Sequence, residues 1–122
     1  MTSFAIVGAG PSGATAAERL ARAGFEVALF DPKGAWEKPC GGGLTYKAYS
    51  QYPFLLHNDT PKKLVSEARL STAKTGAATL ALSRPLVIYS RYDLNNMLLK
   101  RAEKAGAEIE KTRVLGISRQ QR

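Results

Sequence analysis

Two short apolar runs, separated by a helical stretch, open the chain. Residues 3–8 are apolar up to a pair of glycines, which is typical of a buried parallel strand. Residues 11–23 predict a helix, and Gly24 stands just past its end, where a left-handed cap is expected. Residues 26–30 (EVALF) predict a second strand, and Asp31 follows at its carboxyl end. The pattern is that of a β-α-β unit.

The pattern of apolar and polar residues changes in the middle of the chain. Residues 32–44 are rich in Gly and Pro and predict a loop, and residues 45–51 predict a short helix. Three β-leaning stretches follow, at residues 64–72, 77–82 and 86–89. Turn signals stand between them, at Thr75-Gly76 and Arg84-Pro85. We therefore expect an antiparallel excursion over about residues 60–90.

The last third predicts a return to the first sheet. A helix with a plausible capping box, Ser90 with Asp93, is closed by Gly106. Its apolar stripe consists of Leu94, Met97, Leu98, Ala102 and Ala105. Residues 107–111 predict a parallel strand beside the first two, and residues 114–118 predict one more strand. The fold class is therefore α/β, with parallel-sheet pieces at residues 1–44 and 91–122 within a single domain of residues 1–122.

Residues 8–13 (GAGPSG) match the spacing G-x-G-x-x-G between the first strand and the first helix. In this motif Gly8 permits the tight turn, Gly10 lets the backbone approach a pyrophosphate, and Gly13 lets the helix pack closely on the strand. The helix N-terminus then offers N–H groups and a partial positive charge to phosphates. A glycine-rich turn alone is weak evidence, but strand, helix and spacing all agree here.

Asp31 adds a second part to this motif. It lies eighteen residues after Gly13, close to the spacing of about 20 at which a carboxylate accepts the ribose hydroxyls. A carboxylate there argues against a 2′-phosphate, because two negative charges would face each other. The sequence therefore predicts a Rossmann-like dinucleotide site for FAD or NAD, and the motif does not separate those two.

Charge and composition narrow the partners. Residues 1–61 balance five Lys/Arg against five Asp/Glu, so the whole net charge of +8 lies in residues 62–122. The simplest explanation of this basic half is a solvated face, or a surface that meets an acidic remainder of the protein. A more specific hypothesis is that it binds an anionic lipid surface. No nucleic-acid partner is predicted, because the basic residues lack interleaved aromatics. A single cysteine, Cys40, fits the reducing cytoplasm, and no metal site is predicted.

Residues 38–44 (KPCGGGL) are the unusual segment, since three glycines after a cysteine leave a bare backbone that a flat ring could approach. With the motif of residues 8–13 and the later run at residues 90–98 (SRYDLNNML), this segment resembles the N-terminal part of the geranylgeranyl reductase family. These are FAD enzymes with the fold of p-hydroxybenzoate hydroxylase, and they reduce C=C bonds of isoprenoid chains by hydride transfer from reduced flavin.

The resemblance implies roles for individual residues. The pyrophosphate would be held by Gly8, Gly10, Ser12 and Gly13. Asp31 would bind the adenosine ribose, with Lys33 beside it, and the backbone at Val114 would contact adenine. The isoalloxazine region would be lined by Cys40, Gly41 and Gly43, and Cys40 is the candidate catalytic residue, as a proton donor. Arg91 would reach the phosphate or ribityl portion of FAD.

The length of the chain sets a further expectation. Family members run to a few hundred residues, so the resemblance implies an incomplete p-hydroxybenzoate hydroxylase-like fold, a truncated product that is inactive alone. Its implied partners are an isoprenoid or prenyl-lipid substrate, the rest of the fold, and the membrane periphery. Two alternatives stay open: a flavin monooxygenase of the aromatic hydroxylase type, and a non-catalytic dinucleotide-binding module completed by another chain.

Overall fold

The computed structural model describes residues 2–39 and 41–119, which form two compact units. The first unit comprises residues 1–37 and 92–122, and the second comprises residues 38–91. The second unit thus begins earlier than the excursion expected at about residue 60, because it takes in the segment after residue 37.

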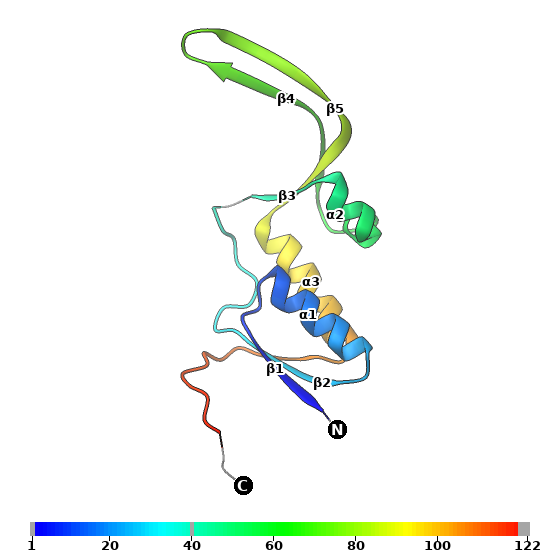
Figure 1. The fold of residues 1–122 in the computed structure, drawn as a ribbon, viewed down its shortest axis with the longest axis vertical. Coiled ribbons are helices and arrows are strands. Elements are labelled where there is room, and N and C mark those ends of the chain that lie inside the picture. The colour runs from blue at the N-terminus through cyan, green and yellow to red at the C-terminus, as the bar shows by residue number, and fades with distance from the viewer. Residues whose placement is uncertain (1, 40, 120–122) are drawn as a thin grey trace. The chain divides into compact units, whose positions relative to one another are not determined.

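The first unit contains a parallel sheet in the order β1-β2-β6. Its strands are β1 (Ser3–Val7), β2 (Glu26–Phe30) and β6 (Glu108–Glu110). Helices α1 (Pro11–Arg22) and α3 (Arg91–Ala105) lie side by side on one face of it (Figure 1). The predicted β-α-β unit and the third parallel strand are confirmed.

Both helices of this unit end in the same way. Gly24 and Gly106 have φ values of +86° and +109°, in the left-handed region that favours glycine. The residue after each glycine donates its N–H back into the helix, Phe25 to the Leu20 oxygen at 3.1 Å and Ala107 to the Ala102 oxygen at 3.0 Å. These are Schellman caps, which satisfy carbonyls that a helix end would otherwise leave unpaired.

A buried ion pair joins the two helices. Glu18 of α1 is only 5% exposed and accepts two hydrogen bonds from Arg101 of α3, at 2.7 and 3.1 Å. Arg22 reaches the same carboxylate at 2.9 Å. A carboxylate is costly to bury without partners, so both arginines stabilise Glu18, and Arg101 is the one that links α3 to α1.

The core of the first unit lies between the helices and β2. Buried apolar side chains there include Val27, Leu29, Ala14, Ala17, Leu94, Leu98, Leu99 and Ala102. On α3, Asn95 and Leu99 are buried, while Met97 and Ala105 of the predicted stripe are half-buried. Within the described residues β1 pairs on one side only, and Val7 is 61% exposed.

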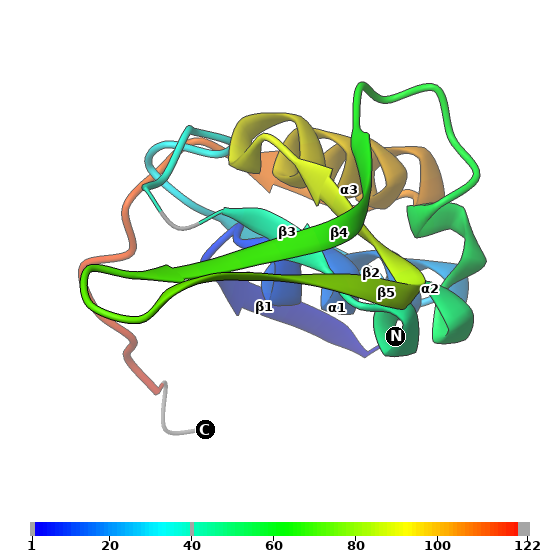
Figure 2. The same cartoon turned by 90° about the horizontal axis from the view of Figure 1, so that it is seen from above.

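The second unit contains an antiparallel sheet in the order β3-β5-β4. Its strands are β3 (Gly42–Leu44), β4 (Lys63–Thr72) and β5 (Gly76–Tyr89). Helix α2 (Tyr46–Gln51) and the 3-10 helix η1 (Pro53–Leu55) connect β3 to β4. Strands β4 and β5 form a long twisted hairpin (Figures 1 and 2), which confirms the antiparallel excursion.

Three local predictions are wrong. Residues 42–44, expected in a loop, form β3, because the bare backbone of Gly42 pairs with Tyr89 of β5. The turn expected at Arg84-Pro85 is absent from the described chain, since β5 runs through Pro85. Residues 114–118, expected as a strand, are irregular, and Leu115 and Ile117 are each 91% exposed.

Candidate dinucleotide site

The glycine turn between β1 and α1 has the conformation that its sequence predicts. Gly8 has a φ of +104°, which an L side chain rarely adopts, and its N–H donates to the Phe30 oxygen at 2.8 Å. A Cβ at Gly13 would stand 1.9 Å from the Gly8 oxygen, so α1 can pack on the end of β1 only with glycine there. Both residues therefore shape the turn.

Gly10 has a different role, because a Cβ built there would meet nothing within 4 Å. It is the N-cap of α1, with Pro11 at the first helical position, and its oxygen accepts the first helical bond, from Ala14 at 2.9 Å. The N–H groups of Ser12 and Gly13 precede that bond and have no acceptor within the helix. No acidic residue lies in this first turn, so the turn can accept a phosphate.

Asp31 lies directly beside this turn. Its Oδ2 accepts the N–H of Ala9 at 2.9 Å, although 22 residues separate the two along the chain. Its Oδ1 accepts the N–H groups of Lys33 at 2.7 Å and Gly34 at 2.9 Å. The carboxylate thus ties the end of β1 to the end of β2, and it brings the acid and the glycine turn together as the motif predicts.

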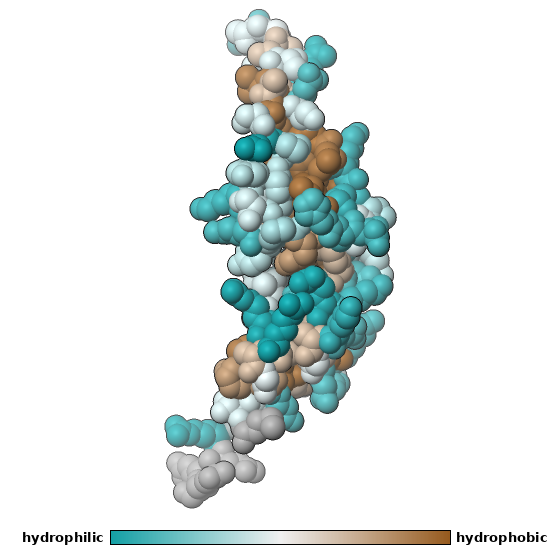
Figure 3. Space-filling model, turned by 90° about the vertical axis from the view of Figure 1, so that its right-hand side faces the viewer, coloured by the Kyte–Doolittle hydropathy of each residue, from teal (hydrophilic) through white to brown (hydrophobic). Residues whose placement is uncertain are grey.

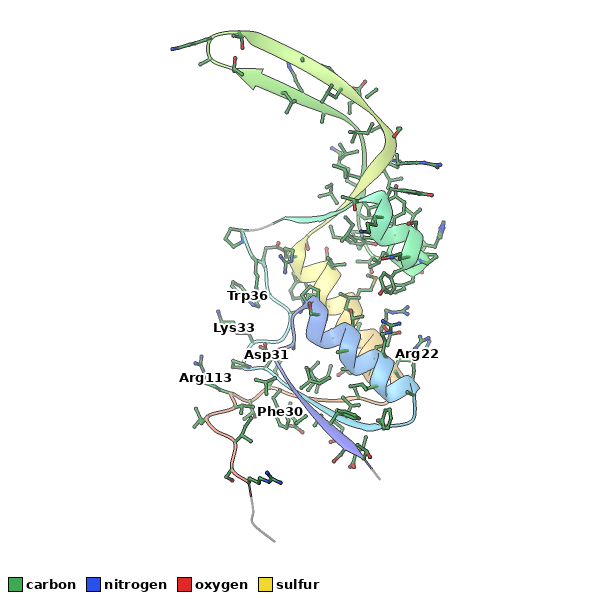
Figure 4. All side chains as sticks on the ribbon, in the orientation of Figure 1. Arg22, Phe30, Asp31, Lys33, Trp36 and Arg113 are labelled. Atoms are coloured by element: carbon green, nitrogen blue, oxygen red, sulfur yellow. The ribbon has the colours of Figure 1, made fainter. Side chains whose placement is uncertain are left out.

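The loop after β2 carries an aromatic and several cations. The ammonium of Lys33 lies 4.2 Å from the ring centre of Trp36, a cation–π contact, and Trp36 is 40% exposed. Figure 4 shows Asp31, Lys33 and Trp36 along this loop, with Arg113 reaching the same side of the unit from the segment after β6. The Lys111 side chain lies 3.7 Å from where a Cβ of Gly34 would stand.

Sequence reasoning overlooked Trp36, Lys111 and Arg113. A signal for the two cations was present, because they follow a parallel strand, and ligands of such sheets gather at the carboxyl ends of the strands. Val114, the expected adenine contact, is half-buried next to Arg113. It lies in the irregular segment that follows β6, and its role at adenine stays a prediction.

The residues expected around the flavin ring lie outside the described part of the unit that carries the glycine turn. Gly41 and Gly43 belong to the second unit, and Cys40 lies outside the described residues. Gly42, which was not among the expected contacts, has a packing reason to be glycine, since a Cβ there would stand 2.5 Å from the Tyr89 oxygen. Arg91 is the first residue of α3.

Three further observations concern the described residues outside the glycine turn. A hollow of about 450 Å³ lies at the last turns of α1 and α3, lined by Arg22, Arg101, Lys104 and Ala105, at the helix ends opposite the glycine turn. The described residues contain no group of three or more His, Cys, Asp or Glu arranged to hold a metal ion. Among them, no helix has the length and apolar character needed to cross a membrane.

Comparisons with known proteins agree with this geometry. Residues 6–54 match the family model of the NAD(P)-binding Rossmann-like domain. In fold, the chain is similar to a flavin-dependent brominase, with a TM-score of 0.78 and 18% identity, over 98% of this chain and 32% of that one. It is also similar to a geranylgeranyl bacteriochlorophyll reductase-like protein from Thermoplasma acidophilum, with a TM-score of 0.76 and 23% identity, over 98% of this chain and 33% of that one.

The fold and the glycine turn thus define a Rossmann-type dinucleotide-binding unit with the architecture of the flavin-dependent hydroxylases and halogenases. In sequence, the chain is 36% identical over 107 residues to the chloroplastic geranylgeranyl diphosphate reductase of Oryza sativa subsp. japonica. It is a relative of the geranylgeranyl reductases and corresponds to their N-terminal portion, as its motifs predict. The match covers 86% of this chain and 23% of the rice protein.

Proposed function

We propose that this chain is the FAD-binding portion of a flavin-dependent oxidoreductase that reduces C=C bonds of isoprenoid chains. The observation that carries the proposal is the hydrogen bond from Ala9 to Asp31, because the acid proposed to bind the ribose thereby lies against the turn proposed to bind the phosphates. Sequence relatives named as geranylgeranyl diphosphate reductases favour the reductase over the aromatic hydroxylase alternative. The activity is proposed for the complete protein, since this chain spans a quarter of such relatives.

The proposed roles divide the site between nucleotide and flavin. Gly8, Gly10, Ser12 and Gly13 bind the pyrophosphate through backbone N–H groups and the helix N-terminus. Asp31 accepts ribose hydroxyls, with Lys33 at its side, and Val114 offers backbone to adenine. Arg91 binds the phosphate or ribityl portion, and Cys40, Gly41 and Gly43 line the isoalloxazine.

When bound in its reduced form, the cofactor supplies a hydride to one carbon of the double bond while the other carbon takes a proton, so that the alkene is reduced and the flavin is oxidised. The residues of this chain orient the cofactor, and Cys40 is proposed to hold the proton. The basic residues that follow residue 61 would face either an acidic remainder of the protein or a cytoplasmic membrane surface that carries the prenyl lipid.

The first test is a titration of the purified protein with FAD, followed by quenching of flavin fluorescence. Saturable binding that ADP displaces is expected, whereas selective binding of NAD or NADP would overturn the FAD assignment. In Asp31→Asn an N–H₂ replaces one of the two accepting oxygens and must face either the Ala9 N–H or the N–H groups of Lys33 and Gly34, so FAD should bind at least about tenfold more weakly. Asp59→Asn, the same substitution at an exposed residue, is the control and should bind as the wild type does.

Gly10→Ala separates ligand binding from folding. Its Cβ meets nothing in the structure, so the unfolding midpoint should stay unchanged while FAD affinity falls. A variant with unchanged affinity would show that no pyrophosphate approaches this backbone.

The catalytic assignment needs its own test in the complete protein. Anaerobic reoxidation of its reduced flavin by geranylgeranyl diphosphate is expected, and Cys40→Ala should slow it. An unchanged rate would remove Cys40 as the proton donor without affecting the FAD proposal.

A further inference from the structure

Ala9, the central residue of the Gly8-Ala9-Gly10 turn, is completely buried, and both of its backbone polar groups bond to side chains of other elements. Its N–H donates to Asp31 Oδ2 at 2.9 Å. Its oxygen accepts a hydrogen bond from Asn95 Nδ2 at 2.8 Å, across 86 residues of sequence. Asn95 lies in α3 and is only 6% exposed.

The Asn95 amide is oriented by this bond alone. Its Oδ1 is buried and has no hydrogen-bond partner among the described residues. A rotated amide would set Oδ1 against the Ala9 oxygen, acceptor against acceptor, so only the observed orientation is favourable. The unpaired Oδ1 of Asn95 is costly to bury. The favourable part of the Asn95 side chain at this position is therefore its Nδ2 donor, which the Ala9 oxygen accepts.

The two bonds act on different peptide groups. Asp31 fixes the peptide between Gly8 and Ala9, and Asn95 fixes the peptide between Ala9 and Gly10. Because a trans peptide points its C=O and N–H in opposite directions, holding the Ala9 oxygen against α3 also aims the Gly10 N–H away from α3. A Cβ built on Gly10 would meet nothing within 4 Å, so a phosphate has room to approach the backbone at this residue.

We propose that Asn95 is a positioning residue for the dinucleotide, which holds the glycine turn in its phosphate-binding conformation before the ligand arrives. The proposal rests on the function proposed above and deepens it. A turn built on two glycines has many accessible conformations, and ordering it at the moment of binding would reduce affinity. Asn95 and Asp31 together remove that cost, one from each side of Ala9.

The experiment compares Asn95→Ala with Asn96→Ala in the full chain. Asn96 is the next residue of α3 and is half-buried, so the pair matches in residue type and helix position. Hydrogen exchange is measured over residues 8–14, and affinity is measured for FAD and, separately, for ADP. Asn95→Ala should exchange faster in this segment and bind both ligands about tenfold more weakly, the effect of one lost hydrogen bond. Asn96→Ala should match the wild type.

Two more variants guard against loss of folding as the explanation. Asn95→Leu has a side chain of similar branched shape and lacks the donor, so it should weaken binding. Its unfolding midpoint should fall, because the Ala9 oxygen loses its partner, and binding is therefore measured under conditions in which the variant is fully folded. Asn95→Asp sets a carboxylate against the Ala9 oxygen at neutral pH, but its protonated form can donate. Its affinity relative to wild type in the same buffers should therefore recover as the pH falls to about 4.

The outcomes separate the two proposals. A folded Asn95→Leu or Asn95→Ala that binds ADP as tightly as the wild type overturns the role of Asn95, as does unchanged exchange over residues 8–14. A wild type that binds ADP but not FAD overturns the flavin assignment and leaves the role of Asn95 standing. A wild type that binds neither ligand overturns both.

Discussion

The two sheets of this chain have three strands each and reach stability by different routes. In the parallel sheet no strand is longer than five residues, and two helices cover one face (Figure 1). In the antiparallel sheet β4 has 10 residues and β5 has 14, yet most of their side chains are exposed. Strand length therefore does not show where the core lies. The core forms where helices pack on the sheet.

Strand β5 is buried at one end and exposed at the other. At its end, Val87 and Tyr89 are buried, and the Tyr89 hydroxyl donates to the Leu55 oxygen at 2.6 Å and accepts from Asn58 at 2.7 Å. Toward the hairpin tip Leu80 is 50% exposed, and Leu70 on β4 is 60% exposed. Figure 3 shows the brown, apolar side chains that reach the surface of this hairpin. The tip is held by backbone pairing, and the base by packing as well.

The largest expected effect is in the helix-covered sheet. Leu29→Ala removes a completely buried side chain and should lower the free energy of unfolding by roughly 2–5 kcal/mol. Urea unfolding followed by the fluorescence of Trp36, the single tryptophan, reports on this unit. Val7→Ala, in the same sheet but 61% exposed, should cost well under half as much. Equal losses would contradict helix cover as the source of stability.

A smaller loss is expected where β3 meets β5. The Cβ of Gly42→Ala would stand 2.5 Å from the Tyr89 oxygen, so the two strands must separate, at a cost of about 1–3 kcal/mol. Hydrogen exchange over residues 42–44 and 86–89 measures it. Gly41→Ala, whose Cβ meets nothing within 4 Å, serves as the control. If the Trp36 transition shifts as well, the two units unfold together rather than separately.

The ion pair between α1 and α3 is expected to matter less. Arg101→Ala removes two hydrogen bonds from buried Glu18 and should cost about 1–2 kcal/mol, because Arg22 still pairs with that carboxylate. The matched control, Arg22→Ala, involves a side chain that is 64% exposed, so its cost should stay below about 0.5 kcal/mol. Thermal unfolding of the two variants in parallel gives the difference, and a reversed order would contradict the burial argument.

The smallest effect is expected at the hairpin tip. Leu70→Ala should change stability by no more than about 0.5 kcal/mol, since the side chain is mostly in water already. Its unfolding midpoint in urea, compared with that of Leu29→Ala, completes the contrast between the sheets. A loss as large as that at Leu29 would mean that something covers the tip.

Much of the first unit could be predicted because its signals are local. Gly8 and Gly13 predict a turn, and Gly24 and Gly106 predict helix ends. Gly8, Gly24 and Gly106 have positive φ values, and a Cβ at Gly13 would overlap the Gly8 oxygen. The spacing of Asp31 from the turn predicts that the two lie close together, as they do, although its bond with Ala9 is not predicted by that spacing. A tight turn or a helix end depends on a few consecutive residues, so it can be predicted from them.

The wrong predictions depended on partners far along the chain. Pro85 ordinarily ends a strand, but it lies in the irregular stretch of β5 opposite the register shift between Val65 and Glu67, where no ladder bond is needed from its nitrogen. Residues 114–118 have strand-forming side chains and, in the described structure, no strand to pair with. Propensity alone could not supply either fact.

The polar residues that fix the first unit were also missed. Glu18 and Asn95 stand on the buried sides of their helices, and each is explained only by a partner on another element. A polar residue within an apolar stripe was the available signal. What it pairs with is a property of the tertiary fold.

The identical caps of α1 and α3 have a consequence for how this region can vary in length. Only three residues separate α1 from β2, and two separate α3 from β6, with a left-handed glycine in each link. Such links are too short to absorb a change in length, so the position of each helix end fixes the register of the strand that follows it. Deleting one residue at Gly24 would turn Val27 and Leu29 toward solvent, since a shift by one place exchanges the faces of a strand. Insertions and deletions among relatives should therefore avoid both links.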